Sequence, residues 1–438
     1  MKQVLKCQKN FYTCGMKKWH KNIIDQVAEY FEESEYVLLE SQMPEHPSSQ
    51  VSYVAAQPKR VIFGKGRHIT NIAKGRKTIS DENPWTAIRD FMDQSLNMIF
   101  GFFGYDLKNF IEPLVSDNPE LIDVPDFYFM EPEIILKIIG EKVEVLTGNV
   151  NLQEIKNQRV SASSESVRNI KRLEEKASYI RKINEVQRLI REGSFYELNY
   201  SYPIQAEITG SPLKIYKKMR EINPVPFGAF IKTNDFQVCC ASPERFIKKT
   251  GRKIISEPIK GTSPRSDEKI ADLKYREELL NEKNKAENLM IVDLVRHDLS
   301  LIAETGSVQV SKLFDVQSFG TVHQLISTIE AIALKDVHPV NVIKACFPMG
   351  SMTGAPKIEV MNTIEDLEIY RRGIYSGAIG YFTPEGDFDF NVVIRSAIMK
   401  GGRVIYPVGG AITGDSNPEE EWEETHVKAR VFTRIAEK

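Results

Sequence analysis

Residues 134–146 read Ile134-Ile135-Leu136-Lys137-Ile138-Ile139-Gly140-Glu141-Lys142-Val143-Glu144-Val145-Leu146, two apolar runs that meet at Gly140-Glu141. Short runs rich in branched apolar residues favour β-strands, and a glycine between two such runs favours a tight turn. The stretch therefore predicts two strands joined directly to each other. Only antiparallel strands accept so short a connection, so the sheet is not purely parallel.

The hairpin is surrounded by strands and helices in irregular order. Residues 97–105 are apolar and glycine-rich, which suggests close backbone packing. Ile180, Ile183, Val186 and Ile190, followed by Gly193, predict an amphipathic helix. Another helix is expected at about 285–299. Further strands are expected at 37–41, 51–55, 196–208, 228–241, 253–255, 376–383, 388–399 and 403–407. Hairpins mixed with helices indicate an α+β fold rather than a regular βαβ array.

A polar stretch over residues 151–172, which includes Ser161-Ala162-Ser163-Ser164-Glu165-Ser166, predicts a linker. It would separate an N-terminal segment, residues 1–150, from a larger part, residues 173–438. The chain of 438 residues is 42% hydrophobic and 27% charged, which is ordinary for a globular protein that buries a large core.

Charge and hydropathy exclude several classes of protein. The net charge of −2 gives no sign of a nucleic-acid partner or of a basic membrane patch. No apolar run is long enough to span a membrane or to act as a signal peptide, so we expect a cytoplasmic protein. The cysteines are odd in number and irregularly spaced, which argues against a disulfide framework. They are Cys7, Cys14, Cys239, Cys240 and Cys346.

The run Ser256-Glu257-Pro258-Ile259-Lys260-Gly261-Thr262 places a lysine where the backbone turns. A lysine at a turn is usually a solvated surface charge. The alternative is an amine whose pKa is lowered, so that it can act as a nucleophile. The run alone leaves both interpretations of Lys260 open.

Two glutamates stand in unusual surroundings. Glu244 follows an apolar strand, where a carboxyl group with a raised pKa could serve as a general acid. Its alternative role is a salt bridge, to Arg245 or to a neighbouring lysine. Glu287 lies on the helix Ala286–Asp298, which is too apolar for a surface element. A glutamate on a buried helix needs a basic partner or a metal.

The last helix is expected to begin at Asn417-Pro418, with the asparagine as its cap. The helix dipole explains Glu419, Glu420 and Glu421, but Glu424 lies a turn further in. Glu421 and Glu424 are three residues apart and can face the same way. Glutamates from two helices, together with water, would suit Mg²⁺.

Two glycine-rich runs, residues 350–357 with Thr353 and residues 408–416, predict turns whose backbone amides could bind anions. Neither run matches the phosphate-binding loop or the GxGxxG of dinucleotide folds. Arg395 is expected in the middle of an apolar strand, where it needs an anion. That anion could be a substrate carboxylate or an internal Asp or Glu.

Taken together and in this order, these segments resemble the chorismate-utilising enzymes, over about residues 176–436. That family includes anthranilate synthase component I, aminodeoxychorismate synthase component I, and the isochorismate and salicylate synthases. The resemblance implies an α+β fold like that of anthranilate synthase component I. In such a fold, large mixed or antiparallel sheets form a sandwich-like core that is wrapped by helices.

The resemblance also implies roles for individual residues. Mg²⁺ would be bound by Glu287 and Glu424, with Glu421 as an outer or water-mediated ligand. Glu244 would protonate the departing 4-hydroxyl of chorismate. The implied substrate-binding residues are His323 near the ring, Thr353, Tyr375, Arg395 and the amides of Gly409 and Gly410.

Lys260 implies the aminodeoxychorismate synthase branch, because anthranilate synthases usually have alanine there. In that chemistry the lysine attacks C2, ammonia then adds at C4, and the product leads to para-aminobenzoate and folate. Anthranilate synthase is the alternative; isochorismate or salicylate synthase and a non-catalytic homologue are further ones. Glu197 stands where the branch has glutamine and the water-adding enzymes have lysine. Its carboxylate could pair with Lys260 and raise the pKa of the amine.

Ammonia would have to come from elsewhere. No cysteine of the chain has the Gly-x-Cys-x-Gly surroundings of a glutaminase nucleophile. The resemblance therefore implies a separate glutamine amidotransferase subunit as partner.

Overall fold

Two long strands, β2 (Ser52–Lys65) and β6 (Phe127–Ile139), organise the computed structural model of this chain. The structure describes residues 19–43, 46, 50–158, 166–319 and 322–436. The two strands pair along most of their length, with a bulge between Pro58 and Arg60. Before the bulge β2 also pairs with β1 (Tyr36–Glu40), and after it with β3 (His68–Ala73). The two long strands therefore take part in two sheets.

The first sheet extends from β1 through strands that pair antiparallel with one another. In spatial order they are β10 (Phe227–Lys232), β11 (Gln237–Ser242), β20 (Ser396–Lys400), β21 (Arg403–Ile412), β9 (Glu197–Thr209) and β8 (Ser166–Arg172). The predicted hairpin is confirmed, because β7 (Lys142–Thr147) pairs with β6. A short strand, β17 (Gly354–Ala355), pairs with the start of β9.

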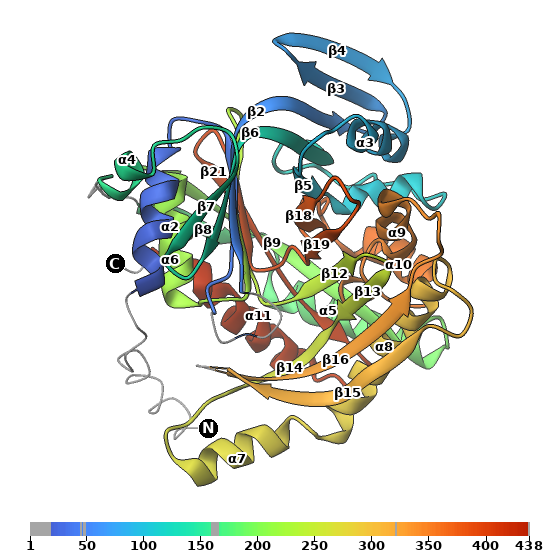
Figure 1. The fold of residues 1–438 in the computed structure, drawn as a ribbon. Coiled ribbons are helices and arrows are strands. Elements are labelled where there is room, and N and C mark those ends of the chain that lie inside the picture. Colours follow the sequence, from blue (N-terminus) through green and yellow to red (C-terminus); the bar gives the residue numbers. More distant parts are fainter. Residues whose placement is uncertain (1–18, 44–45, 47–49, 159–165, 320–321, 437–438) are drawn as a thin grey trace.

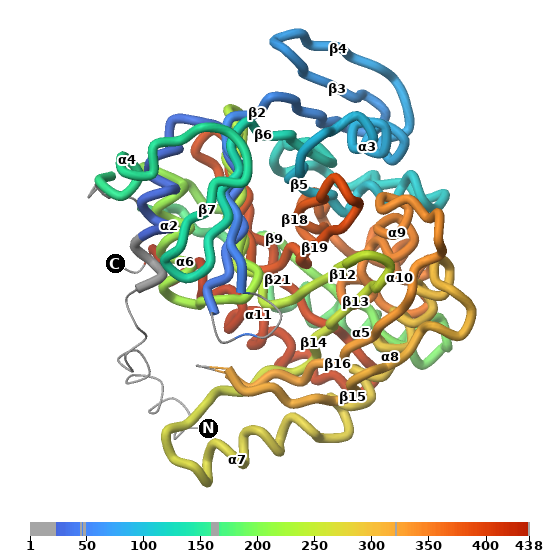
Figure 2. The backbone as a smooth tube through the Cα atoms, in the orientation of Figure 1, coloured from blue at the N-terminus to red at the C-terminus, as the bar shows by residue number. Residues whose placement is uncertain are grey.

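The second sheet extends from the other half of β6, again with antiparallel pairing. In spatial order its strands are β5 (Ile99–Phe103), β18 (Ala378–Phe382), β19 (Phe388–Asn391), β12 (Arg245–Thr250), β13 (Lys253–Glu257) and β16 (Val322–Ile332). β16 also pairs with β14 (Ile259–Pro264) and β15 (Gln309–Ser318). The ribbon of β3 and β4 (Arg76–Asp81) projects at the top of the molecule (Figure 2).

Helices cover the outer faces of both sheets (Figure 1). Over the first sheet lie α2 (Trp19–Tyr30), α5 (Lys176–Arg191), α6 (Pro212–Ile222), α10 (Lys357–Leu367) and α11 (Pro418–Thr433). Over the second lie α3 (Pro84–Asp93), α8 (Glu282–Ser300) and α9 (Pro339–Cys346). The remaining helices are η1 (Tyr105–Phe110), α4 (Leu152–Lys156), α7 (Lys269–Glu278) and η2 (Gly350–Met352).

Side chains alternate between the space under the helices and the space between the sheets, as the pleat of a strand requires. On β1, Leu38 belongs to the core under the helices, whereas Val37 belongs to the core that both sheets enclose. Likewise, Cys239 belongs to the core under the helices and Cys240 to the core between the sheets. The predicted α+β fold, with a sandwich-like core wrapped by helices, is confirmed.

Close backbone packing at residues 97–105 is also confirmed. A Cβ atom added to Gly101 would lie 1.9 Å from the carbonyl oxygen of Tyr128 on the neighbouring strand β6. Only glycine leaves room for that approach.

The stretch predicted as a linker, residues 151–172, contains α4 and β8 in its described part. β8 pairs with β9, and β1 of the N-terminal segment pairs with β10 of the larger part. The two segments thus share one sheet. Residues 159–165 lie outside the described residues, as do Cys7 and Cys14. Cys239, Cys240 and Cys346 are buried free thiols.

Several local predictions need correction. Helix α8 is not fully buried, because one of its sides faces solvent and Leu289 is 45% exposed. The stretch expected as strand at 228–241 is divided into β10 and β11, and the one at 388–399 into β19 and β20. Val408–Ile412 is not a turn but the end of β21. Among the helices of the described ranges, none is long and apolar enough to cross a membrane.

Candidate active site

The predicted site lies where the chain passes from one sheet to the other. Glu244 stands between β11 of the first sheet and β12 of the second, and Arg395 stands between β19 and β20. The two crossings are adjacent, because the Ala241 amide donates to the Arg395 carbonyl at 3.2 Å and the Val392 amide donates to the Glu244 carbonyl at 3.0 Å. Topology thus brings together residues that are about 150 positions apart in sequence.

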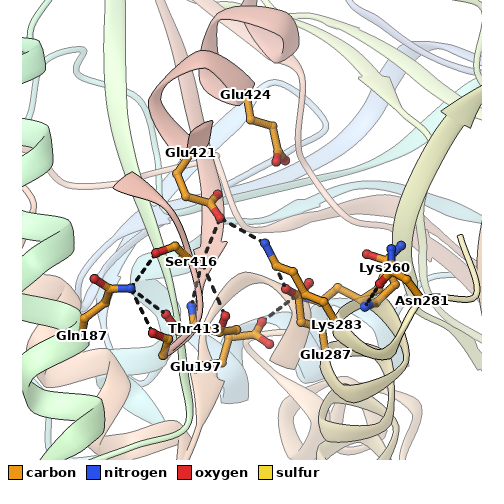
Figure 3. Close-up of polar contacts among 12 residues, drawn as sticks. Gln187, Glu197, Lys260, Asn281, Lys283, Glu287, Thr413, Ser416, Glu421 and Glu424 are labelled. Carbon is orange, nitrogen blue, oxygen red and sulfur yellow. Dashed lines mark hydrogen bonds and ion pairs between the residues drawn. The ribbon is translucent and has the colours of Figure 1, made fainter. Parts of the chain in front are cut away.

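Lys260 is buried, so the surface-charge interpretation is wrong. Its side chain is 9% exposed, and its Nζ donates to Oε1 of Glu197 at 2.6 Å (Figure 3). The Glu197 side chain, at the start of β9, is fully buried. Its second oxygen, Oε2, has no hydrogen-bond partner among the described residues. A buried carboxylate oxygen that is left unpartnered is costly unless a ligand or water approaches it.

Opposing influences act on the pKa of the Lys260 amine. Burial alone would lower it, but the carboxylates of Glu197, Glu287 and Glu244 outweigh burial and hold it above the ordinary value. The amine is therefore protonated in the free protein. A nucleophilic role requires that it first pass its proton to a neighbour.

Glu244 has the electrostatics of a general acid. Burial raises the pKa of its carboxyl group to about 7, although a hydrogen bond from Ser351 and the charges of Lys260 and Arg395 oppose the rise. Arg245 turns away from it, to Asp389 at 2.9 Å and to Glu257. The alternative of a salt bridge between Glu244 and Arg245 is thus not what the structure has.

Glu287 on α8 and Glu421 on α11 face each other across one ammonium group. The Nζ of Lys283 lies 3.6 Å from Oε1 of Glu421 and 3.9 Å from Oε1 of Glu287 (Figure 3). Burial raises the pKa of both carboxyl groups, and neighbouring carboxylates add to the rise, Glu197 at Glu287 and Glu424 at Glu421.

Glu424 is paired with a lysine of its own helix in this structure. Its Oε1 forms an ion pair with Lys428 Nζ at 2.7 Å, and that lysine lowers the pKa of the carboxyl group. The helix start itself is as predicted, because Asn417 Oδ1 accepts hydrogen bonds from the amides of Glu419 and Glu420.

In the described part of the chain, no three His, Cys, Asp or Glu side chains come together as a metal cage. The Lys283 ammonium nevertheless shows that Glu287 and Glu421 face a common cation position. Mg²⁺ keeps several waters and needs only one or two protein carboxylates. The residues present therefore fit a divalent cation.

Glu421 is positioned by the loop after β21. Ser416 Oγ donates to Glu421 Oε1 at 2.8 Å and accepts from the Thr413 amide at 3.1 Å. Gln187 on α5 fixes this loop, because its Nε2 donates to the carbonyls of Thr413, Gly414 and Ser416 (Figure 3). The sequence did not point to Gln187 and Ser416 as site residues. Both are ordinary polar residues, and nothing in their sequence neighbourhood marks these contacts.

Gly409 and Gly410 lie in strand rather than in the expected turn, opposite Ser201 and Tyr200 of β9. The Gly409 carbonyl accepts from Lys428 at 2.8 Å. A Cβ atom at Gly410 would lie 3.5 Å from Glu421 Oε2, so this glycine leaves space in front of the carboxylate.

Arg395 was expected mid-strand, but it lies in the break between β19 and β20 with φ +51°. It forms no ion pair with a carboxylate of the described residues, so the alternative of an internal Asp or Glu partner is not found there. The hydroxyl of Tyr406, a residue that the sequence did not single out, is buried and has no hydrogen-bond partner among the described residues. The Arg395 charge acts on that hydroxyl and on Glu244. An anionic ligand would satisfy Arg395.

The other expected substrate-binding residues differ in their surroundings. Tyr375 is buried just before β18. Thr353 is fully buried, and its hydroxyl donates to the Met349 carbonyl at 3.0 Å. His323 uses both ring nitrogens, with Ser318 Oγ at 2.7 Å and Asp272 Oδ1 at 3.0 Å. The structure gives His323 no contact with Lys260 or Glu244 among the described bonds.

A buried arginine that the sequence did not reveal, Arg372, connects the segments around Glu197. Arg372 forms a pair with Glu368 at 2.6 Å, and it donates to the carbonyls of Asn199 and Met352 at 2.7 Å. It thereby ties β9, which carries Glu197, to η2.

With this geometry in view, comparison with known proteins identifies the family. Residues 34–434 match the family described as chorismate binding enzyme. The chain belongs to that family.

Named relatives agree with this membership. The aminodeoxychorismate synthase of Streptomyces griseus is 45% identical over 260 residues, which are 59% of this chain and 36% of that protein. Aminodeoxychorismate synthase component 1 of Escherichia coli is 31% identical over 92% of this chain and 93% of that protein. Anthranilate synthase component I of Streptococcus pneumoniae has a similar structure, with a TM-score of 0.78 and 27% identity, over 96% of this chain and 100% of that chain. The chain thus spans about a third of the Streptomyces relative.

Proposed function

We propose that this protein is the chorismate-converting component of an aminodeoxychorismate synthase, which turns chorismate and ammonia into 4-amino-4-deoxychorismate. The observation that carries the proposal is a buried lysine amine, Lys260, in a family site that also holds a carboxyl group with a pKa of about 7, Glu244. The names of the Streptomyces griseus and Escherichia coli relatives support it.

Binding would begin with the charges of the substrate. Chorismate is a dicarboxylate, and Arg395 offers a guanidinium without an internal partner in the described structure. Tyr375, Thr353 and the Gly409–Gly410 strand would complete the pocket. Glu287, together with Glu421 and Glu424, would hold Mg²⁺. The bound metal would neutralise a carboxylate of the substrate.

Covalent catalysis needs a neutral amine at Lys260. Glu197 lies 2.6 Å away and can accept the proton. The amine then forms a bond to C2, both ring double bonds shift, and the C4–O bond breaks. Glu244 gives its proton to the departing hydroxyl, which leaves as water.

Ammonia completes the exchange. Its nitrogen forms a bond to C4, both ring double bonds shift back, and the C2–N bond to Lys260 breaks. The lysine leaves as a neutral amine and recovers its proton from Glu197, while the new ammonium group returns a proton to Glu244. The relatives named component 1 imply a second component, and we propose a glutamine amidotransferase that supplies the ammonia.

The test supplies the purified chain with chorismate, Mg²⁺ and an ammonium salt, and identifies the product by mass spectrometry. We expect 4-amino-4-deoxychorismate, and a covalent adduct on Lys260 when ammonia is left out. Lys260→Ala should lose both while it still binds chorismate. Anthranilate as the main product would show instead that nitrogen adds at C2.

A further inference from the structure

Lys283 occupies an unusual place on the first turn of α8. A cation there is disfavoured by the positive end of the helix dipole. Its ammonium nevertheless lies 3.6 Å from Glu421 and 3.9 Å from Glu287, the two carboxylates that face a common cation position (Figure 3). We propose that Lys283 is an internal counter-ion, which fills the cation position of the metal-free protein and leaves it when a divalent metal enters. This inference rests on the metal site of the proposed function.

The ammonium is held loosely, whereas its partners are fixed. Both distances exceed the 2.7–3.2 Å or so of a direct hydrogen bond. The Lys283 side chain is 49% exposed, but that of Glu287 is 14% exposed and that of Glu421 is 7% exposed. Lys283 can therefore swing into solvent without any repacking, and the two carboxylates stay behind.

Neighbouring lysines do not share this arrangement. Lys260 donates to Glu197 at 2.6 Å, and Lys428 pairs with Glu424 at 2.7 Å. Each of these two ammonium groups is directly bonded to a single carboxylate. Among the ion pairs of the described residues, only Lys283 is shared between α8 and α11.

A counter-ion is needed because two carboxylates on separate helices repel each other. Lys283 offsets this repulsion and keeps α8 and α11 in place before metal arrives. A divalent cation between the same carboxylates would repel the ammonium at similar range. Metal and ammonium therefore compete, and the affinity for metal is reduced by the stability of the lysine contact.

The experiment measures Mn²⁺ binding to the full chain, without substrate, by the electron paramagnetic resonance signal of free Mn²⁺. Lys283→Met removes the competing charge, so we expect Mn²⁺ to bind about tenfold more tightly. Lys283→Arg keeps the charge and should bind like the unaltered protein. Lys285→Met removes a lysine from the same turn and should change the affinity by less than about twofold, since Lys285 has no ion pair in the described structure.

Thermal unfolding gives a second measurement. In the presence of a chelator, Lys283→Met should melt at a lower temperature than the unaltered protein. Saturating Mn²⁺ should raise the melting temperature of Lys283→Met by more than it raises that of the unaltered protein. Adding Glu287→Gln to Lys283→Met should abolish the gain in affinity. Equal or weaker Mn²⁺ binding by Lys283→Met, or binding by neither protein, overturns the inference. Product formation is not part of this test, so a failure of the proposed reaction would be seen separately.

Discussion

The Nζ of Lys260 and Oε1 of Glu197 are 2.6 Å apart, and both side chains are buried. The ammonium of Lys260 therefore donates directly to a buried carboxylate. The same contact that keeps Lys260 protonated in the free protein thus gives its proton a place to go. In the proposed reaction, Glu197 accepts this proton before the Lys260 amine attacks the substrate.

Glu197→Gln should move the pH dependence of Lys260 to lower pH. The carboxylate of Glu197 is the largest influence that raises the pKa of Lys260, and burial acts in the opposite direction. Without Glu197, burial should lower the pKa of Lys260, so the neutral amine should prevail at lower pH. The measurement is the rate of adduct formation with chorismate against pH, by intact-protein mass spectrometry. Glu385→Gln, at an exposed turn, should leave the profile unchanged. An unshifted profile in Glu197→Gln would contradict this account.

Activity should fall as pH rises above about 7. Glu244 has a pKa of about 7 because it is buried, and it must be protonated to assist the departing hydroxyl. Glu244→Gln should lower kcat by roughly 10²–10⁴-fold and remove the alkaline limb. Steady-state rates between pH 5 and pH 9 test both points. If the limb persists in Glu244→Gln, another group titrates.

Glu244 should also make folding depend on pH. Its pKa is raised from about 4.5 unfolded to about 7 folded, so the folded state binds the proton more tightly. The stability this group contributes is complete below about pH 4.5 and is lost as pH rises to about 7, a change of about 3 kcal/mol. Glu244→Gln should therefore be more stable than the unaltered protein at pH 8, and the difference should shrink towards pH 5. Urea unfolding at both pH values measures it, and a difference that does not depend on pH would refute the raised pKa.

Local patterns predicted most of the strands, because alternation and turn residues are properties of neighbouring positions. Gly140 marks the β6–β7 hairpin by its residue type alone. The break at Arg395 was missed, since the apolar residues around it continue the strand pattern while the chain crosses between sheets. Arg372 was missed for a similar reason, because its partner and its two acceptors come from three separate segments. Lys260 was recognised only through resemblance; burial and the contact with Glu197 are tertiary facts.

Arg395→Met should weaken chorismate binding without unfolding the protein. The guanidinium forms no ion pair with a described carboxylate, so its removal leaves no buried charge behind. A charge-assisted hydrogen bond of about 2–3 kcal/mol corresponds to a KM increase of roughly 30- to 150-fold. Arg395→Lys should show a smaller increase in KM. Arg403→Met, at an exposed position, is the control and should leave KM unchanged. A large fall in the free energy of unfolding would indicate an internal partner instead.

Arg372→Met should destabilise the protein more than the loss of a surface arginine. Arg372 and Glu368 are each 1% exposed at the side chain, and removal of one partner leaves an uncompensated buried charge, at about 3–5 kcal/mol. Arg188→Met is the matched control, because its pairs with Glu185 and Glu192 are solvent-exposed and should contribute little to the free energy of unfolding. Adding Glu368→Gln to Arg372→Met should restore part of the free energy of unfolding, since the unpaired charge is then gone. Activity should stay low in that double variant, because the carbonyls of Asn199 and Met352 still lack the donor that ties β9 to η2.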